Sequence, residues 1–199
     1  MNTVVNFTEF RERGRNVSPL VLIDLHHDLS GGAEMLGNTI PTEMIANCRA
    51  ALRHARAYGI PVAFTRQVAP SPSMLGSPIY PRWIEGFEPK RCDMVFDRQR
   101  LSCYASAEFR DMADDVGGNY VVAGQFGELS CLSTAIDALH RDHRPTFLTD
   151  ALVSHSREDL SAGAMPRALA RIFSLYAEVT RTQPWIVATS PRVGVGVRT

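Results

Sequence analysis

Four polar residues stand at the ends of short apolar stretches, where side chains that do chemistry often lie. Asp24 ends an apolar run near the N-terminus, and a carboxylate in such surroundings is costly unless it is paired or used. Gln67 and Arg98 follow two later apolar runs, and Ser130 follows a fourth. A carboxylate can act as a general acid or base, and a hydroxyl can act as a nucleophile. These residues are therefore the candidates for a reaction centre.

The stretch 121–138 shows how such residues can be positioned. It predicts a buried strand, a turn that Gly124 and Gly127 make possible, and a helix whose first turn holds Ser130 and Cys131. In an open α/β sheet, ligands bind beyond the carboxyl ends of the strands, where helix N-termini gather. Ser130 also has a simpler interpretation as a helix N-cap, a position that serine often fills.

Apolar strands and amphipathic helices alternate along the chain. This alternation predicts a three-layer α/β/α domain with a mostly parallel six-stranded sheet and a Rossmann-like topology. The predicted strands are 19–25, 60–65, 93–96, 119–123, 146–149 and 178–181; the main helices are 41–58, 106–116, one from 132 onward, and 168–176 after a break at Pro166. We expect one domain over residues 1–199, with an N-terminal arm at 1–17 and a C-terminal tail at 183–199. Because the carboxyl ends of parallel strands meet at one edge, the four polar residues should lie together.

The composition favours a globular protein that acts on a small molecule. The chain has 21 basic and 21 acidic residues, so nothing suggests a nucleic-acid partner or an anionic membrane. No apolar run approaches the ~20 residues of a membrane span, and the first residues lack the apolar core of a signal peptide. The four cysteines show neither a C-x-x-C pair nor metal-finger spacing, which predicts reduced thiols. We therefore expect a cytoplasmic protein without a membrane partner.

Four motifs, in order along the chain, carry a resemblance to a known family. They are VLIDLHHDL, DMVFDRQRLSCYASAEF, GQFGELSCLSTAIDAL and RDHRPTFLTDALVSHS, and the matches run from about residue 19 to residue 179. The chain resembles the isochorismatase-like hydrolases, also called the cysteine hydrolase family. Each motif alone is moderately specific for the family, but four motifs in the right order indicate the family strongly. The resemblance implies a hydrolase with the fold predicted above.

In that family the acting residues are an aspartate after strand one, a lysine after strand three and a cysteine at the fourth turn. Asp24 matches the aspartate, Arg98 stands at the lysine position, and an ungapped count from both flanks puts Ser130 at the cysteine position. Cys131 comes one residue later, which on a helix turns a side chain by ~100°. We therefore expect Ser130 to line the pocket and Cys131 to face the core. Arg98 could orient Asp24 or bind a substrate carboxylate.

The resemblance leaves more than one function open. Isochorismatases of siderophore and phenazine pathways also lack the cysteine, and they hydrolyse a vinyl ether by proton transfer from the aspartate. We expect a hydrolase of a small, carboxylate-bearing molecule, with Asp24 as general acid/base and with Arg98 and Ser130 as further catalytic residues. The alternatives are an amidohydrolase that uses Ser130 or Cys131 as nucleophile, and a catalytically silent protein that binds a small molecule.

Gln67, Cys131 and His26 are the candidate substrate-binding residues, and Gln67 occupies the position of a glutamine that assists the isochorismatases. The sequence predicts neither a metal nor a cofactor. The family's metal-binding amidases place Asp-x-His and a further histidine after strand two, where this chain has RQVAPSPS. His26, His27 and Asp28 are adjacent, so their side chains cannot easily converge on one metal from a strand end.

Two apolar regions predict a homodimer or homotetramer. One is the proline-rich loop 70–81 with Trp83, and the other is the apolar tail segment Trp185, Ile186 and Val187. A monomer would struggle to cover both surfaces. Family members that resemble this chain are commonly dimers or tetramers.

Overall fold

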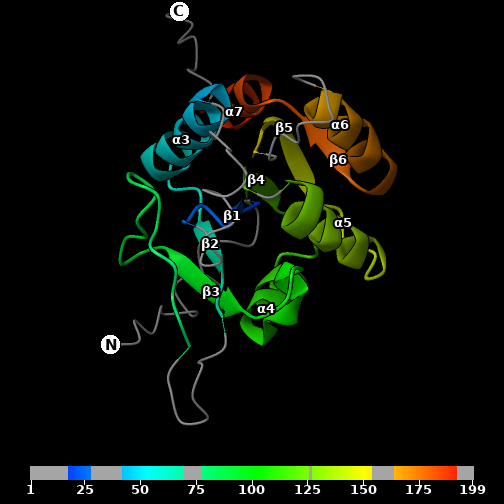
Figure 1. Cartoon of the computed structure of the whole chain (residues 1–199). Helices are drawn as coiled ribbons and strands as arrows, with labels where there is room; N and C mark the ends of the chain where they lie inside the picture. The colour runs from blue at the N-terminus through cyan, green and yellow to red at the C-terminus, as the bar shows by residue number, and fades with distance from the viewer. Residues whose placement is uncertain (1–17, 28–41, 70–77, 126, 154–163, 192–199) are drawn as a thin grey trace, which may run out of the picture.

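The computed structural model describes residues 18–27, 42–69, 78–125, 127–153 and 164–191, which form a sheet between two layers of helices (Figure 1). The predicted arm at 1–17, Asp28, most of the loop at 70–81 and the end of the tail lie outside the described residues. Within the described ranges, no helix has both the length and the apolar character needed to cross a bilayer.

The sheet has six strands in the order β3-β2-β1-β4-β5-β6, and all of its strand pairs are parallel. The strands are β1 (Leu20–Ile23), β2 (Val62–Gln67), β3 (Met94–Arg98), β4 (Val121–Gln125), β5 (Thr146–Val153) and β6 (Glu178–Thr180). Each overlaps a predicted strand, so the predicted α/β fold class is confirmed. The order along the sheet reverses between β1 and β4, which is the place where open α/β sheets bind their ligands.

Helices cover both faces of the sheet. Helices α3 (Thr42–Ala57) and α7 (Thr182–Thr189) lie on one face, and α4 (Ala107–Asp115), α5 (Leu132–Leu139) and α6 (Ala164–Tyr176) lie on the other (Figure 1). Successive residues of β1 point to opposite faces. Leu22 accordingly packs in the cluster that includes α3, and Ile23 packs in the cluster that includes α4 and α5.

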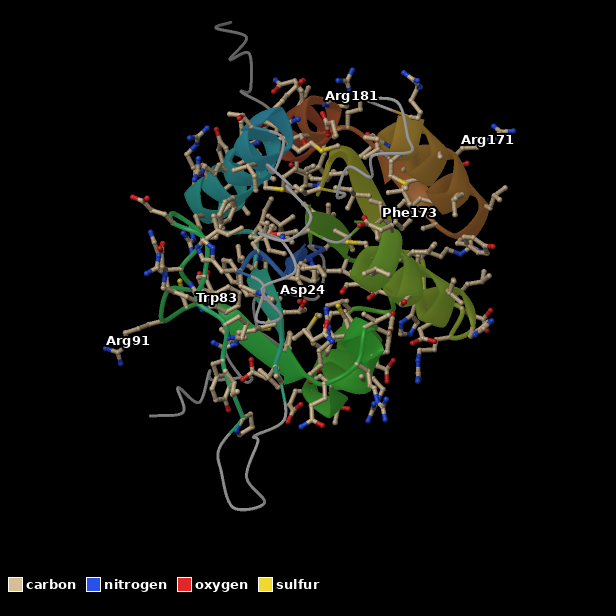
Figure 2. All side chains as sticks on the ribbon, in the orientation of Figure 1. Asp24, Trp83, Arg91, Arg171, Phe173 and Arg181 are labelled. Carbon is tan, nitrogen blue, oxygen red and sulfur yellow. The ribbon has the colours of Figure 1, made fainter. Side chains whose placement is uncertain are left out.

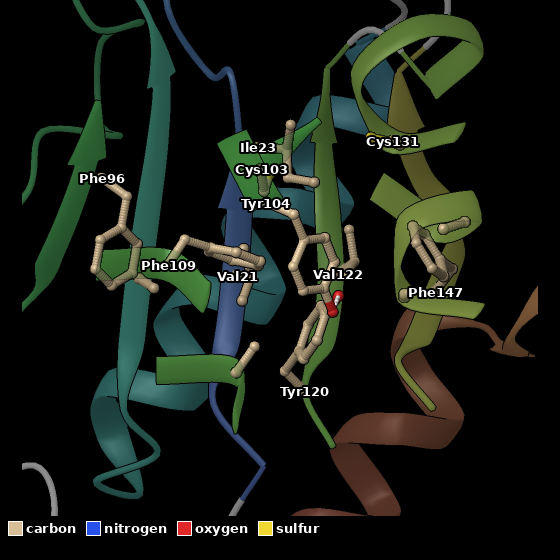
Figure 3. Packing of buried hydrophobic residues seen from close by; sticks show 14 of the residues in the cluster. Val21, Ile23, Phe96, Cys103, Tyr104, Phe109, Tyr120, Val122, Cys131 and Phe147 are labelled. Carbon is tan, nitrogen blue, oxygen red and sulfur yellow. Dashed lines mark hydrogen bonds between the residues drawn. The ribbon is translucent and has the colours of Figure 1, made fainter. Parts of the chain in front are cut away.

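The cluster on the α4 side is rich in aromatic rings (Figure 3). Phe109 of α4 makes edge-to-face contacts with Phe96 of β3, with Tyr104 and with Tyr120, at centroid distances of 5.2 to 5.8 Å. Such contacts add to the stabilisation that burial provides. This packing fixes the outer strand β3 to the centre of the sheet.

The C-terminal part is more helical than the sequence predicts. Residues 183–189, expected to belong to a tail, lie in α7, and the Asp150 carboxylate accepts hydrogen bonds from the Thr182 backbone N–H and hydroxyl at 2.8 Å each. Trp185 is buried, with its ring 5.2 Å from that of His54 in α3, so it belongs to the core and not to an exposed apolar segment. Pro166 does not break a helix but lies in the first turn of α6, where no backbone N–H bond is lost.

Gly124 allows β4 to approach β1 closely. Its φ is +151°, and a Cβ at this position would lie 2.2 Å from the carbonyl oxygen of Ile23. The sequence suggested that Gly124 serves the turn after β4, but its main role is this strand contact. Asp24 follows Ile23 directly, so the close contact also holds the turn beyond β4 beside Asp24.

Candidate active site

Asp24 lies just beyond the end of β1, at the centre of the sheet edge. Figure 2 shows it near the middle of the molecule, between the helices of the two faces. Its side chain is fully buried, and its φ of +54° is in the left-handed region, which aspartate tolerates better than most residues. The backbone N–H of Gln67, at the end of the neighbouring β2, donates to Asp24 Oδ1 at 3.2 Å. Strained backbone of this kind concentrates at functional sites.

Arg98 reaches Asp24 from the end of β3, past β2. Its Nη2 donates to Asp24 Oδ2 at 2.6 Å, and its Nη1 donates to the Arg100 carbonyl at 2.6 Å. The side chain is fully buried, so both terminal nitrogens are engaged inside the protein. This arrangement matches the orienting role that the sequence analysis considered for Arg98, and it leaves no exposed fork for a substrate carboxylate.

Ser130 lies in a five-residue π-helical turn, Gly127–Cys131, which precedes α5. Its buried hydroxyl donates to Asp24 Oδ2 at 2.7 Å. The hydroxyl therefore bonds a carboxylate and not a backbone N–H, so Ser130 is not a helix N-cap. π-helical turns of this kind often mark functional sites, because the extra residue redirects a side chain.

Cys131 points away from this cluster, as the helical register predicts. Its side chain is fully buried in the core with Ala135, and its Sγ lies 3.5 Å from the Gln125 carbonyl oxygen. Burial raises the pKa of the Cys131 thiol well above its ordinary value. Cys131, which the sequence analysis grouped with the substrate-binding residues, is thus placed among core side chains.

His26 lies against the other oxygen of Asp24. Its Nε2 is 3.4 Å from Asp24 Oδ1, its Nδ1 is 3.1 Å from the His27 carbonyl oxygen, and its ring meets Trp83 edge-on. His26 was expected among the substrate-binding residues, and its contact with Asp24 was not expected from the sequence. The side chain of Gln67 is half-buried at the end of β2, and Gln67 is paired with Arg98 in the register of β2 and β3.

The charge state of Asp24 follows from these contacts. Burial raises the pKa of the Asp24 carboxyl, but His26, the Arg98 guanidinium and the Ser130 hydroxyl all lower it, and the pKa ends below its ordinary value. At neutral pH the group is a carboxylate, which can accept a proton. The proton of Ser130 Oγ is directed at this carboxylate along the 2.7 Å hydrogen bond.

Thr134 supports the turn that carries Ser130, a role that the sequence did not predict. Its buried hydroxyl donates to the Ser130 carbonyl at 2.7 Å and accepts from the Cys103 N–H at 3.0 Å. The spacing of four residues from Ser130 is the signal that could have identified it, because residues four apart share a helix face. Among the residues that the structure describes, no group of three or more histidine, cysteine, aspartate or glutamate side chains is placed to hold a metal ion.

Comparison with known proteins finds one family. A model of the isochorismatase domain matches residues 18–184. Enterobactin synthase component B of Escherichia coli K12 is 26% identical over 131 residues, which cover 59% of this chain and 46% of that protein. The isochorismatase of Bacillus subtilis 168 is 25% identical over 151 residues, which cover 67% of this chain and 48% of that protein. The chain thus spans about half the length of these curated relatives.

Solved structures share the fold at low sequence identity. A cysteine hydrolase from Pseudomonas syringae pv. phaseolicola superposes with a TM-score of 0.68 and 18% identity, over 85% of this chain and 91% of that one. An isochorismatase-like hydrolase from Alkaliphilus metalliredigens gives a TM-score of 0.68 and 16% identity, over 87% of this chain and 99% of that one. At this identity the likeness concerns the arrangement of helices and strands.

Proposed function

This chain belongs to the isochorismatase family, and on that basis we propose that it is a hydrolase of a small, carboxylate-bearing molecule, with Asp24 as the general acid/base. The observation that carries the proposal is the buried contact of Ser130 Oγ with Asp24 Oδ2 at 2.7 Å, beside Arg98. These contacts bring together residues from three segments of the chain, at the edge of the sheet where α/β proteins bind ligands. The carboxylate-bearing substrate class is supported by the isochorismatases that the chain resembles.

Two bond classes fit, and they differ in the direction of the first proton transfer. For a vinyl ether, as in isochorismatases, Asp24 would have to take up a proton before it could give one to the substrate; water would add to the resulting cation, and the C–O bond would then break. For an amide, Asp24 would first take the proton of Ser130, whose oxygen would attack the carbonyl. The hydrogen bond from Ser130 to Asp24 favours the second candidate, and the likeness to isochorismatases favours the first.

A substrate panel tests the proposal. Purified protein would be assayed with isochorismate-type vinyl ethers and with small amides of carboxylate-bearing molecules, with hydrolysis products followed by chromatography. Turnover of one class of compound would establish that the protein is a hydrolase. It would also show whether the protein cleaves a vinyl ether or an amide bond. Saturable binding of these compounds without turnover would instead show a catalytically silent binding protein and overturn the proposal.

We predict that Arg98 acts through Asp24 rather than through the substrate. Arg98→Ala would leave a buried carboxylate without its cation, which typically costs ~3–5 kcal/mol of stability. Arg98→Lys should retain part of the charge, lower kcat and leave KM nearly unchanged, because the lost contacts are internal. Urea unfolding and steady-state kinetics would measure these effects.

The matched control for Arg98 is Arg66→Ala. Arg66 bonds Asp97 on the same pair of strands, but these side chains keep 16% and 36% exposure, and their ion pair should be worth only ~0–1 kcal/mol, apart from the contacts of Arg66 with the Tyr80 and Trp83 rings. If Arg98→Ala unfolds at the same urea concentration as Arg66→Ala, the buried pair has no structural role. If Arg98→Lys raises KM without lowering kcat, Arg98 binds the substrate.

We also propose a homodimer or homotetramer in the cytoplasm. All four cysteines are free thiols, which suits a reducing compartment. Val187 of α7 stays 66% exposed and Tyr58 after α3 stays 51% exposed, although Trp185 is buried within the chain. Light scattering at micromolar concentration should give at least twice the mass of one chain, and a monomeric mass would contradict the proposal.

A further inference from the structure

One buried polar group at this edge of the sheet takes no part in the contacts around Asp24. Gln125 ends β4, and only 2% of it is exposed. Its side-chain oxygen, Oε1, is buried, and no group in the described stretches of the chain donates a hydrogen bond to it. Buried amides of folded proteins nearly always have hydrogen-bond partners, because burial without one is costly. The unpaired oxygen of Gln125 therefore indicates a partner that is not part of the fold.

Gln125 occupies the same level of the sheet as Asp24, one strand along. Ile23 of β1 pairs with Gly124 of β4, so Asp24 and Gln125 are the residues that follow this pair on neighbouring strands. Adjacent strands lie ~4.8 Å apart. The order of the strands also reverses between β1 and β4, which is where open α/β sheets bind their ligands. Gln125 thus stands beside the proposed acid/base, at the place where a substrate is expected.

The neighbours of Gln125 within the sheet fix its backbone but cannot pair its side chain. Gln125 pairs with Val153 of β5, and its carbonyl oxygen lies 3.5 Å from the Sγ of Cys131. Val153 packs in the cluster on the α3 side of the sheet, as does Ala123, two residues before Gln125. Paired residues and alternate residues of a strand share a face, so Gln125 belongs to this apolar face. The side chains of Val153 and Ala123 offer no hydrogen-bond donor.

We propose that Gln125 Oε1 is a specificity-determining group, which accepts a hydrogen bond from a hydroxyl or an amide N–H of the substrate. This inference rests on the proposed hydrolase function and narrows its substrate class, because the molecule then carries a neutral hydrogen-bond donor in addition to its carboxylate. An amide oxygen has no charge that would offset the burial of an ammonium group, so the donor is neutral. A site with a buried acceptor rejects an analogue that lacks the donor, since the acceptor then stays unpaired.

Binding of simple carboxylates tests the inference. Benzoate and the isomeric monohydroxybenzoates share a ring and a carboxylate, and the isomers place one hydroxyl at different distances from that carboxylate. In isothermal titration calorimetry, at least one isomer should bind the wild-type protein at least ~10-fold more tightly than benzoate does. Gln125→Met keeps the length of the side chain and removes its hydrogen-bonding groups, so this variant should bind that isomer and benzoate alike.

Asn47→Leu is the matched control, because the amide of Asn47 has a partner within the fold. Its Nδ2 donates to the Asp150 carbonyl at 2.8 Å. Asn47→Leu should therefore unfold at a lower urea concentration than the wild-type protein and keep the preference for the hydroxylated ligand. Gln125→Met should unfold at the wild-type urea concentration or a higher one, since an unpaired buried polar group is removed. A decrease as large as that of Asn47→Leu would show that the Gln125 amide is bonded within the fold, and would overturn the inference.

The binding and turnover results separate the inference from the proposed function. Equal affinity for all of these benzoates, binding of none of them, or a preference that persists in Gln125→Met overturns the inference. A preference that Gln125→Met abolishes, in a protein that hydrolyses no compound of the substrate panel, supports the inference and rejects the proposed function. Turnover of panel substrates with the same kcat/KM in Gln125→Met as in the wild-type protein supports the function and overturns the inference.

Discussion

Asp24→Asn is expected to lower kcat by ~10²–10⁴-fold, the range that general acid–base groups typically contribute. Asparagine has nearly the same shape, and its amide oxygen can still accept hydrogen bonds from Arg98 and Ser130. It cannot take up a proton at any accessible pH, so the proton transfer is lost; its Nδ2 also replaces the Oδ1 that accepts the Gln67 N–H, so one buried hydrogen bond is lost with it. The measurement is the initial rate of the purified variant on the best substrate of the panel.

The control for Asp24→Asn is a second buried carboxylate. Asp93 pairs with Arg56 at 2.5 Å and is as well buried, but it lies before β3, at the opposite edge of the sheet. Asp93→Asn should lose stability of the same order as Asp24→Asn and keep its activity, since each loses a charged partner of an arginine. A folded Asp24→Asn protein that turns over at the wild-type rate would remove Asp24 from the mechanism.

Ser130→Cys is expected to create a thiol that alkylates at least ~10-fold faster than any buried cysteine of the parent protein, because a thiolate is stabilised at a helix start and beside a cation. The new Sγ would stand where Ser130 Oγ now meets Asp24, with Arg98 on the same oxygen. Cys92 is the exposed thiol of the parent, so the experiment belongs in a Cys92→Ser background. Mass spectrometry after iodoacetamide pulses would identify the labelled position and its rate.

Cys131→Ala is the matched control at the neighbouring position. Its thiol is buried with a strongly raised pKa, so the variant should keep nearly all turnover and lose only core packing. If Cys131 is instead the residue that alkylates fast, and its loss abolishes turnover, the nucleophile is Cys131 and the register assigned from the sequence is wrong. Ser130→Ala would then be nearly as active as the parent.

The fold could be predicted from the sequence, and so could the proximity of Asp24, Arg98 and Ser130, because each depends on a local pattern. Short apolar runs define buried parallel strands, and parallel strands bring their carboxyl ends to one edge. Asp24, Arg98 and Ser130 each stand at such an end, and the structure brings them together. The position of Cys131 followed from the helical period in the same way.

The remaining features depend on contacts that no local pattern encodes. His26 reaches Asp24 because Asp24 has a left-handed backbone and because Trp83, far along the chain, bridges to His26. Trp185 is buried because Asp150 of β5 caps α7, which makes a helix from what resembles a tail. From the sequence, Arg98 could equally orient Asp24 or bind a substrate carboxylate. Its hydrogen bond to the Arg100 carbonyl, which occupies the second terminal nitrogen, favours the first role.

The buried contacts of Asp24 also have a consequence for how the chain folds. Its cation comes from 74 residues away and its hydroxyl partner from 106 residues away. A chain that had paired β1 with β2 alone would bury a carboxylate with neither partner, which is costly in an apolar interior. Closing such long loops is also slow compared with forming local contacts. We therefore expect the central strand to reach its full stability only with β3 and β4 docked, so that completion of the sheet and formation of the active site should be one cooperative step.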